Sequence, residues 1–185
     1  DMWQYVQQHS PGAIIIGSHV QKTTTQLHEL LKLPNVEGIE VNVERIKKGE
    51  ILELLPEILE KARDTHSNGR HPAIYTSRNE LEFDCFEDRL HFGEEVSNFL
   101  MDVVRGLPPT LGFLISKGGI TTNDVLSKGL ALSTSRVVGQ ILPGCSVVCC
   151  PSSHPRYPEM PVVIFPGNVG NHYGLATVFQ RLAKA

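Results

Sequence analysis

The chain has 185 residues and a formal net charge of −3, with 41% hydrophobic and 20% charged residues. These values are typical of a soluble globular protein, and we expect a single domain over residues 1–185. The slight acidity argues against a nucleic-acid partner, and the absence of a membrane-length apolar run or secretory signal favours the cytoplasm. Because Asp1 stands first, we interpret the chain as an engineered fragment or as a module cut from a longer polypeptide.

The cysteines and histidines do not form a metal-binding pattern. Cys85, Cys145, Cys149 and Cys150 lack zinc-ribbon spacing, and the eight histidines are scattered. The sequence also lacks the pattern of a secreted disulfide framework. We therefore predict buried, reduced thiols and assign no residue to a metal.

The first half of the chain alternates apolar strand-like runs with helical patterns. Pro56 lies inside the third helical pattern, so that helix either starts there or is kinked. The predicted elements are the end of a helix over Met2–His9, a strand at Ala13–Ile16, a helix at Lys22–Leu33, a strand at Glu37–Val43, a helix at Ile51–Thr65 and a strand at Pro72–Thr76.

The second half continues the alternation after an acidic segment, Ser77–Arg89, which we interpret as a surface loop. A glycine pair, Gly118-Gly119, precedes a short helix that we expect to be N-capped by Thr121 or Thr122 and closed by Gly129. The other predicted elements are a helix at Phe92–Arg105, strands at Leu111–Ile115, Val137–Leu142, Val147–Cys150 and Pro161–Phe165, and a helix at Tyr173–Ala183.

This order predicts an α/β fold with three layers: a mostly parallel, mixed sheet with helices on both faces, Rossmann-like in arrangement. The region around 136–165 has strands without helices between them, so antiparallel pairing is expected there.

Three predicted strand ends carry small, polar or glycine-rich residues: Gly17-Ser18-His19, Lys117-Gly118-Gly119 and Pro166 to Gly170. Each alone could be an ordinary tight turn. Ligands of open parallel sheets bind outside the carboxyl ends of the strands, so three such ends together favour a ligand site. Backbone amides and little side-chain bulk suit a phosphorylated ligand. Neither the Walker pattern nor the Gly-x-Gly-x-x-Gly fingerprint is present.

Other candidates carry weaker signals. Ser18-His19 could indicate a serine nucleophile, but no Gly-x-Ser-x-Gly elbow or acid partner accompanies it. Lys117 could reach a phosphate or remain a solvated charge, and Arg136 could contact a nucleotide or only cover apolar surface. Three acidic residues could bind Mg²⁺, but we favour a solvated acidic loop as their explanation: Asp84, Glu87 and Asp88.

Three segments occur in a recognisable order: Gly17-Ser18 followed by Thr23 and Gln26, then Ser116–Thr121, then Phe165–Gly170. Together they resemble the carboxyl-terminal, nucleotide-binding half of the four-carbon acid sugar kinase family, over Gly12 to Leu182. The resemblance implies ATP and Mg²⁺ as cofactors and phosphoryl transfer to sugar acids such as threonate, erythronate and their oxo forms. It places Ser18, Gly118, Gly119 and Gly167 at the ATP, and Thr121, Asn168 and Gly170 in the nucleotide loops.

The chain departs from that family at two places. Ile120 stands where relatives often have an acidic residue, and Phe165-Pro166 precede the last glycine loop where a lysine and a small residue are common. The family's amino-terminal half, which binds the sugar acid and should supply the catalytic base, is the implied partner on the same polypeptide, so the catalytic residue stays unknown. Two other interpretations are a degenerate or regulatory nucleotide-binding module and a small hydrolase or transferase that uses Ser18.

Overall fold

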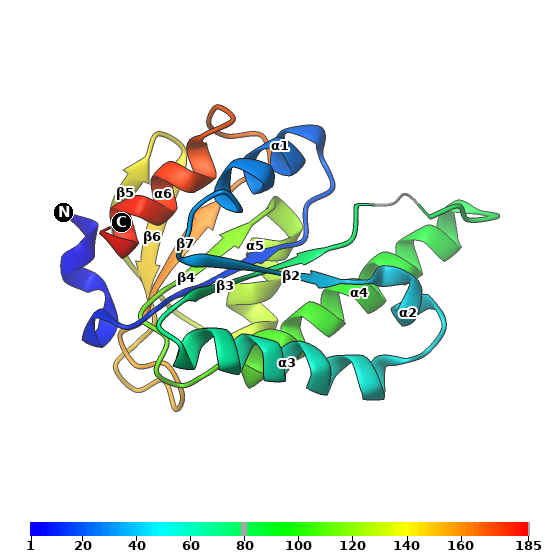
Figure 1. Cartoon of the computed structure of the whole chain (residues 1–185), viewed down its shortest axis with the longest axis horizontal. Coiled ribbons are helices and arrows are strands. Elements are labelled where there is room, and N and C mark those ends of the chain that lie inside the picture. Colours follow the sequence, from blue (N-terminus) through cyan, green and yellow to red (C-terminus); the bar gives the residue numbers. More distant parts are fainter. Residues whose placement is uncertain (79–80, 185) are drawn as a thin grey trace.

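The computed structural model describes residues 1–78 and 81–184, which form a seven-stranded sheet between two layers of helices (Figure 1). The prediction of a three-layer, mixed α/β fold is confirmed. The spatial order of the strands is β2-β3-β1-β4-β7-β6-β5. The strands are β1 (Ala13–Ile16), β2 (Val36–Val41), β3 (His71–Thr76), β4 (Leu114–Lys117), β5 (Arg136–Leu142), β6 (Cys145–Cys149) and β7 (Pro161–Phe165).

Five neighbouring strands, β2, β3, β1, β4 and β7, are parallel, whereas β6 and β5 pair antiparallel at one edge. The antiparallel pairing expected around 136–165 is therefore confirmed. The central strands β1 and β4 are buried along their whole length, as expected of parallel strands covered on both faces. Arg136 begins the edge strand β5, where its Nη2 lies 3.9 Å from Glu159 Oε2 and far in strand order from β1.

Each predicted α-helix after Met2–His9 is present, although several ends differ, and one helix, Val43–Lys47, was not predicted, because Val43 was assigned to the preceding strand. Met2–His9 forms two short 3₁₀ helices instead of the end of an α-helix. The helix that contains Pro56 runs without interruption. The helices are η1 (Met2–Tyr5), η2 (Gln7–His9), α1 (Gln21–Leu30), α2 (Val43–Lys47), α3 (Ile51–Ser67), α4 (Phe86–Gly106), α5 (Gly119–Asp124), η3 (Val125–Gly129) and α6 (Gly174–Ala183).

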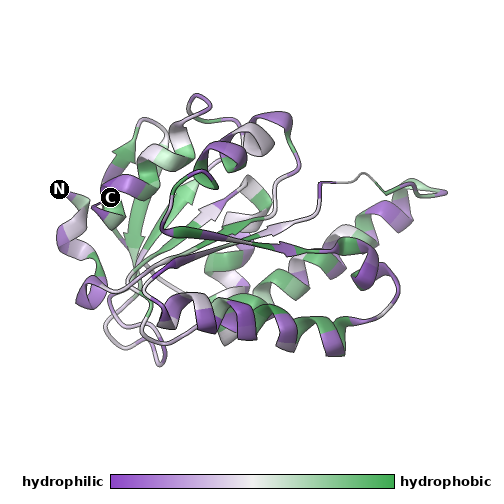
Figure 2. Cartoon of the chain, in the orientation of Figure 1, coloured by the Kyte–Doolittle hydropathy of each residue, from purple (hydrophilic) through white to green (hydrophobic). Residues whose placement is uncertain are grey.

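Alternate residues of β1 face the two helical layers. Ile14 and Ile16 belong to the core under α1 and α6, whereas Ala13 and Ile15 belong to the core under α3 and α4. Figure 2 shows the hydrophobic colouring concentrated in the strands and on the helix faces turned toward them. The sheet therefore lies between two separate apolar layers.

Helix α4 is longer than the part of it that packs on the sheet. Its second half contains a buried run that includes Phe99 and Val103, whereas Phe86 and Leu90 in its first half are 67% and 55% exposed. The predicted loop Ser77–Arg89 is therefore wrong over its last four residues, which are helical, and residues 79–80 lie outside the described part. Cys85 at the start of α4 is exposed, contrary to the prediction of buried thiols, whereas the other three cysteines are buried and unpaired.

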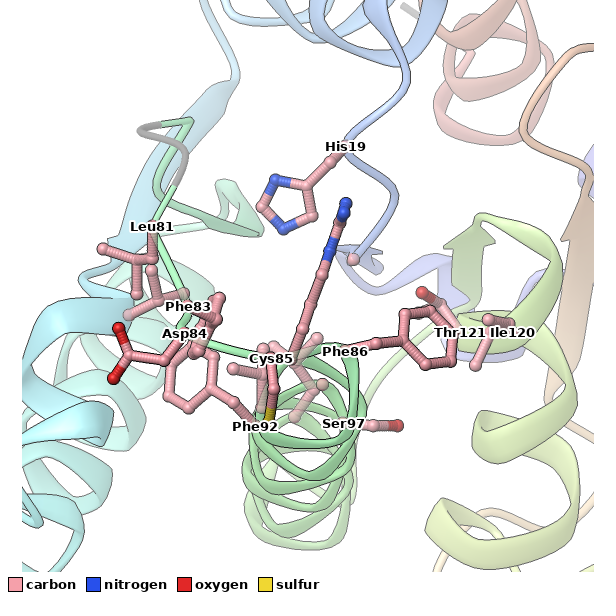
Figure 3. A pocket seen from close by; sticks show the side chains of 16 residues that line it. His19, Leu81, Phe83, Asp84, Cys85, Phe86, Phe92, Ser97, Ile120 and Thr121 are labelled. Carbon is pink, nitrogen blue, oxygen red and sulfur yellow. The ribbon is translucent and has the colours of Figure 1, made fainter.

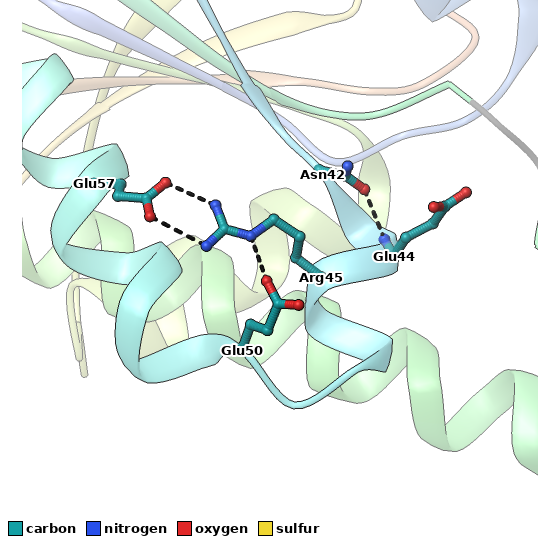
Figure 4. A network of polar contacts seen from close by, with 5 residues as sticks. All are labelled: Asn42, Glu44, Arg45, Glu50 and Glu57. Atoms are coloured by element: carbon teal, nitrogen blue, oxygen red, sulfur yellow. Dashed lines mark hydrogen bonds and ion pairs between the residues drawn. The ribbon is translucent and has the colours of Figure 1, made fainter.

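A charged network holds the corner between α2 and α3 (Figure 4). Arg45 donates to Glu50 through Nε and to both carboxylate oxygens of Glu57 through its terminal nitrogens, at 2.7 to 3.1 Å. Asn42 caps α2 by accepting a hydrogen bond from the Glu44 amide at 2.9 Å. The hydrogen bonds from Arg45 lower the pKa of Glu57. These contacts hold α2, the helix that follows β2, against the start of α3.

Among the helices of the described residues, none is both long enough and apolar enough to cross a membrane.

Candidate site at the carboxyl ends of three strands

The three predicted loops leave the sheet side by side. Ile16 of β1 pairs with Lys117 of β4, and Lys117 pairs with Phe165 of β7, so Gly17, Gly118 and Pro166 emerge at the same level. The chain continues to α1 and α6 on one face from β1 and β7, but to α5 on the other face from β4. We call residues 17–19, 117–119 and 166–170 together the glycine-loop edge. Their predicted proximity is confirmed.

The loop after β1 packs directly against the start of α5. A Cβ atom on Gly17 would lie 2.4 Å from Thr121 Oγ1, so no larger residue fits there without movement. Ser18 Oγ accepts a hydrogen bond from Thr23 Oγ1 at 3.1 Å. Thr23 is not a base, so this contact does not activate Ser18 as a nucleophile. The Thr23 hydroxyl also lies 3.4 Å from the carbonyl oxygen of Gly167, which joins the first loop to the third.

The loop after β4 depends on its two glycines in different ways. Gly118 has a φ of +121° and donates its N–H to the Phe165 carbonyl at 2.9 Å, so it is required for the backbone path. Gly119 is exposed, and a Cβ atom on it would meet no atom of the described residues within 4 Å. The predicted cap was wrong, because Gly118 and not a threonine is the N-cap of α5.

Lys117 is turned away from solvent and toward the loop after β7. Its side chain is completely buried, and its Nζ donates to the carbonyl oxygens of Pro166 and Gly167 at 2.8 and 3.0 Å. The ammonium also lies 4.1 Å from the centre of the Phe165 ring. Burial lowers the pKa of Lys117 to about 8. Neither sequence-based alternative for Lys117, a phosphate contact or a solvated charge, agrees with this position.

Side chains of helix α1 bind further carbonyl groups in residues 168–171. Gln26 is buried, and its Nε2 donates to the carbonyl oxygens of Val169 and Asn171 at 3.0 and 2.7 Å. Lys22 Nζ donates to the Asn168 carbonyl at 3.0 Å. In contrast, the backbone N–H groups of residues 167–170 make no hydrogen bond to any residue that the structure describes. One side of the loop therefore carries N–H donors that have no partner among the described residues. The other side carries carbonyl acceptors that are already hydrogen-bonded.

Arg78, which the sequence analysis did not identify, also reaches this edge from the end of β3. Its Nη1 donates to the Ser18 carbonyl, and its Nε and Nη2 are buried without a hydrogen-bond partner among residues 1–78 and 81–184. Burial lowers the pKa of Arg78. This guanidinium adds positive charge beside the first loop, and no local sequence pattern marks it.

A cavity of about 700 Å³ adjoins the glycine-loop edge on the side of α4. Gly17, His19 and Thr121 line it on the side of the glycine-loop edge, and residues of α4 and of the segment before α4 supply most of the remaining lining. In Figure 3, the Phe86 ring extends toward Thr121 and Ile120, while His19 points down into the cavity. The lining is mainly apolar, with Phe83 and other rings, and His19 Nε2 lies 3.2 Å from Thr76 Oγ1.

The described residues of the acidic segment, 77–78 and 81–89, are not part of any cluster arranged to hold a metal ion. No group of three histidine, cysteine, aspartate or glutamate side chains in the described part of the chain is arranged to hold a metal ion. Asp84 lines the cavity. The Mg²⁺ alternative for the three acidic residues of that segment has no geometric support.

An open α/β sheet with three adjacent glycine-rich loops at its carboxyl edge is the architecture of a nucleotide-binding domain. The chain belongs to the family described as nucleotide-binding C-terminal domains, which it matches over residues 13–175. No curated protein shows significant similarity to it.

Solved structures with the same fold are distant in sequence. A domain of unknown function from Bordetella bronchiseptica, crystallised with bound citrate as a domain-swapped dimer, has a TM-score of 0.72 at 13% identity and covers 94% of this chain. A putative tRNA synthase from Salmonella typhimurium LT2 has a TM-score of 0.61 at 17% identity and covers 93%. The chain spans 41% of the length of each of these two proteins.

Proposed function

We propose that this chain is the ATP-binding domain of a kinase that phosphorylates four-carbon sugar acids of the threonate, erythronate or 3-oxo-tetronate type. One observation carries the proposal: the N–H groups of residues 167–170 have no hydrogen-bond partner among the described residues, while the carbonyl oxygens of residues 166–169 accept hydrogen bonds. Free amides beside Gly119 suit the phosphate chain of a nucleotide. The resemblance of the three loop segments to that kinase family supports the choice of reaction.

The predicted site residues take two kinds of role in this proposal. Gly119, Gly167 and Gly170 expose backbone to the phosphates, and Asn168 contributes its amide. Ser18, Gly118 and Thr121 shape the loops, since Gly118 supplies the unusual φ and Thr121 packs on Gly17. Phosphoryl transfer requires mainly positioning and charge stabilisation, which amides, Arg78 and Lys22 can contribute.

We assign the nucleoside end of ATP to the adjoining cavity. Its volume lies in the range of small-molecule sites, and its aromatic lining suits a flat base. Mg²⁺ would enter with the nucleotide, held by phosphate oxygens and water, because the ion retains much of its hydration at such sites. The sugar acid and the catalytic base would come from a further domain on the same polypeptide.

The first prediction is that ATP or ADP with Mg²⁺ binds this chain, whereas the chain alone phosphorylates no sugar acid. A nucleotide at about a hundredfold over its Kd should stabilise the fold by about 2.7 kcal/mol. A thermal-shift titration measures the effect, with inorganic phosphate and adenosine as partial ligands. No shift at millimolar ATP would contradict the proposal, as would sugar-acid kinase activity of the isolated chain.

Adding a separate sugar-acid-binding domain distinguishes a kinase domain from a regulatory module. A kinase domain should then transfer phosphate from ATP to a sugar acid, detected as ADP release that depends on the acid. Nucleotide binding without any such turnover, with both domains folded, would support a regulatory or degenerate nucleotide-binding module instead.

A further inference from the structure

We propose that Lys117 and Gln26 are positioning residues that hold residues 166–171 in a phosphate-binding conformation before any ligand arrives. The inference rests on the proposed nucleotide site and concerns how that site is built. Neither residue contacts the ligand in this arrangement. Each binds carbonyl groups on the protein side of the loop and thereby sets the direction of its N–H groups.

The planar peptide unit connects the two sides of the loop. The carbonyl of one residue and the N–H of the next lie in one plane and point in opposite directions. The carbonyls of Pro166, Gly167, Asn168 and Val169 all accept hydrogen bonds from side chains, at the surface for Asn168 and in partly buried positions for the other three. The N–H groups of residues 167–170 must therefore point the other way, and they are the four that have no partner in the described part of the chain.

The surroundings of Lys117 indicate that its positive charge stabilises the conformation of residues 166–171. Its side chain is fully buried, yet it forms no ion pair with the residues that the structure describes, and its ammonium contacts two carbonyl oxygens and the Phe165 ring. Buried ammonium groups usually pair with a carboxylate because desolvation is costly. Here two carbonyl oxygens of the loop take the place of a carboxylate. The positive charge lies on the side of the loop opposite to the proposed phosphates.

The amide of Gln26 also makes its hydrogen bonds to the loop, although its own oxygen is left without one. Its Nε2 makes two hydrogen bonds, to the Val169 and Asn171 carbonyls, whereas its buried Oε1 has no partner among residues 1–78 and 81–184. Turning the amide over would bring its oxygen against two carbonyl oxygens, so the contacts fix its orientation. A loop fixed in advance loses little further entropy on binding, which strengthens binding of the ligand.

The charge state of Lys117 gives this arrangement a pH dependence. Desolvation is the main cause of its lowered pKa of about 8, and the charged or titratable neighbours are Cys145 on β6 and Lys22 on α1. As pH rises through 8, the ammonium becomes an amine, the carbonyl contacts weaken, and the positive charge behind the loop disappears. Phosphate-containing ligands should therefore bind more weakly at pH 9 than at pH 7, whereas adenosine should be unaffected.

The test compares ATP, ADP and adenosine binding to the wild-type chain, Lys117→Met and Gln26→Met by titration calorimetry at pH 7 and pH 9. Both variants keep similar side-chain length but remove the donors. We expect each to lose about tenfold or more in ATP and ADP affinity, with adenosine affinity unchanged. Lys117→Met should also abolish the difference between pH 7 and pH 9. Lys32→Met, which removes an exposed charge just beyond the carboxyl end of α1, is the matched control and should bind as the wild type does.

The outcomes separate the inference from the proposed function. If the wild-type chain does not bind ATP, the proposed function fails. If the wild type binds but both variants bind ATP equally well, or lose ATP and adenosine equally, the positioning role is wrong. Should Lys117→Met fail to fold, Gln26→Met and the wild-type pH profile decide the question: an unchanged Gln26→Met affinity together with a flat profile would overturn the inference.

Discussion

Replacing Gly119 with valine is expected to weaken ATP binding about a hundredfold, or about 2.7 kcal/mol, while the fold is retained. The position is exposed, its φ lies outside the left-handed region, and a Cβ atom there would meet no described atom within 4 Å. A branched side chain is therefore compatible with the protein but extends into the space where we place the phosphates. Calorimetric titration with ATP and adenosine measures the loss, which should be confined to ATP.

Two further substitutions serve as controls for the Gly119→Val experiment. Asn123→Val introduces the same side chain at an exposed position further along α5, and it should bind ATP as the wild type does. Gly118→Val should instead disrupt the fold, because φ is +121° and the Cβ would lie 3.0 Å from Ser18 Cβ. Wild-type ATP affinity in a folded Gly119→Val protein would show that the phosphates lie elsewhere.

Acidification from pH 6.5 to pH 4 is expected to reduce the free energy of unfolding by up to about 3 kcal/mol through His71 alone. The His71 side chain is 7% exposed, packs against Phe113 and Phe179, and accepts a hydrogen bond from the Gly12 N–H on Nδ1 at 3.0 Å. Burial lowers the pKa of His71 from 6.5 to about 4, and nearby His66 adds to this.

The sign of this effect of pH on stability follows from proton uptake on unfolding. Between pH 4 and pH 6.5 the unfolded chain binds a proton on His71 that the folded chain does not, so stability falls as pH falls through this window. Urea unfolding at pH 7, 5.5 and 4 measures the slope. His71→Leu should lower stability at pH 7 but flatten the slope, whereas His28→Gln, at an exposed position on α1, should keep it. Equal slopes for the wild type and His71→Leu would contradict the assignment to His71.

The sequence predicts the ends of two buried strands correctly, whereas the strand predicted at Leu111–Ile115 is observed at Leu114–Lys117. Ala13–Ile16 and Pro161–Phe165 are confirmed with their predicted ends because branched apolar residues there match burial on both faces. The N-cap of α5 was predicted at Thr121 or Thr122, three or four residues after its position at Gly118. Thr122 appeared to be a cap, but its hydroxyl donates to the Ser116 carbonyl at 3.1 Å, so a contact within the fold replaces the local capping preference.

The glycine-loop edge could be predicted as a cluster but not in its details. The carboxyl ends of parallel strands lie at one edge of a sheet, so the sequence alone predicts that the three loops lie at the same edge. The contacts of Lys117 with residues 49 and 50 positions away, and of Gln26 with residues 143 and 145 positions away, have no local signal. Their direction depends on the packing of α1 and β4 around the last loop. The assignment of Ser18, Gly118 and the other site residues to ATP stays a prediction.

Both ends of the described chain lie at the amino edge of the sheet, away from the glycine-loop edge (Figure 1). Helix α6 starts after the loop that follows β7 and runs back, so Lys184 comes to lie with its Nζ 5.1 Å from the centre of the Trp3 ring. A protein immobilised on a sensor surface through either end would therefore present its three loops to the solution. The same proximity makes the fold suitable for circular permutation, with the ends joined by a short peptide and the chain reopened at the exposed turn around Gly69.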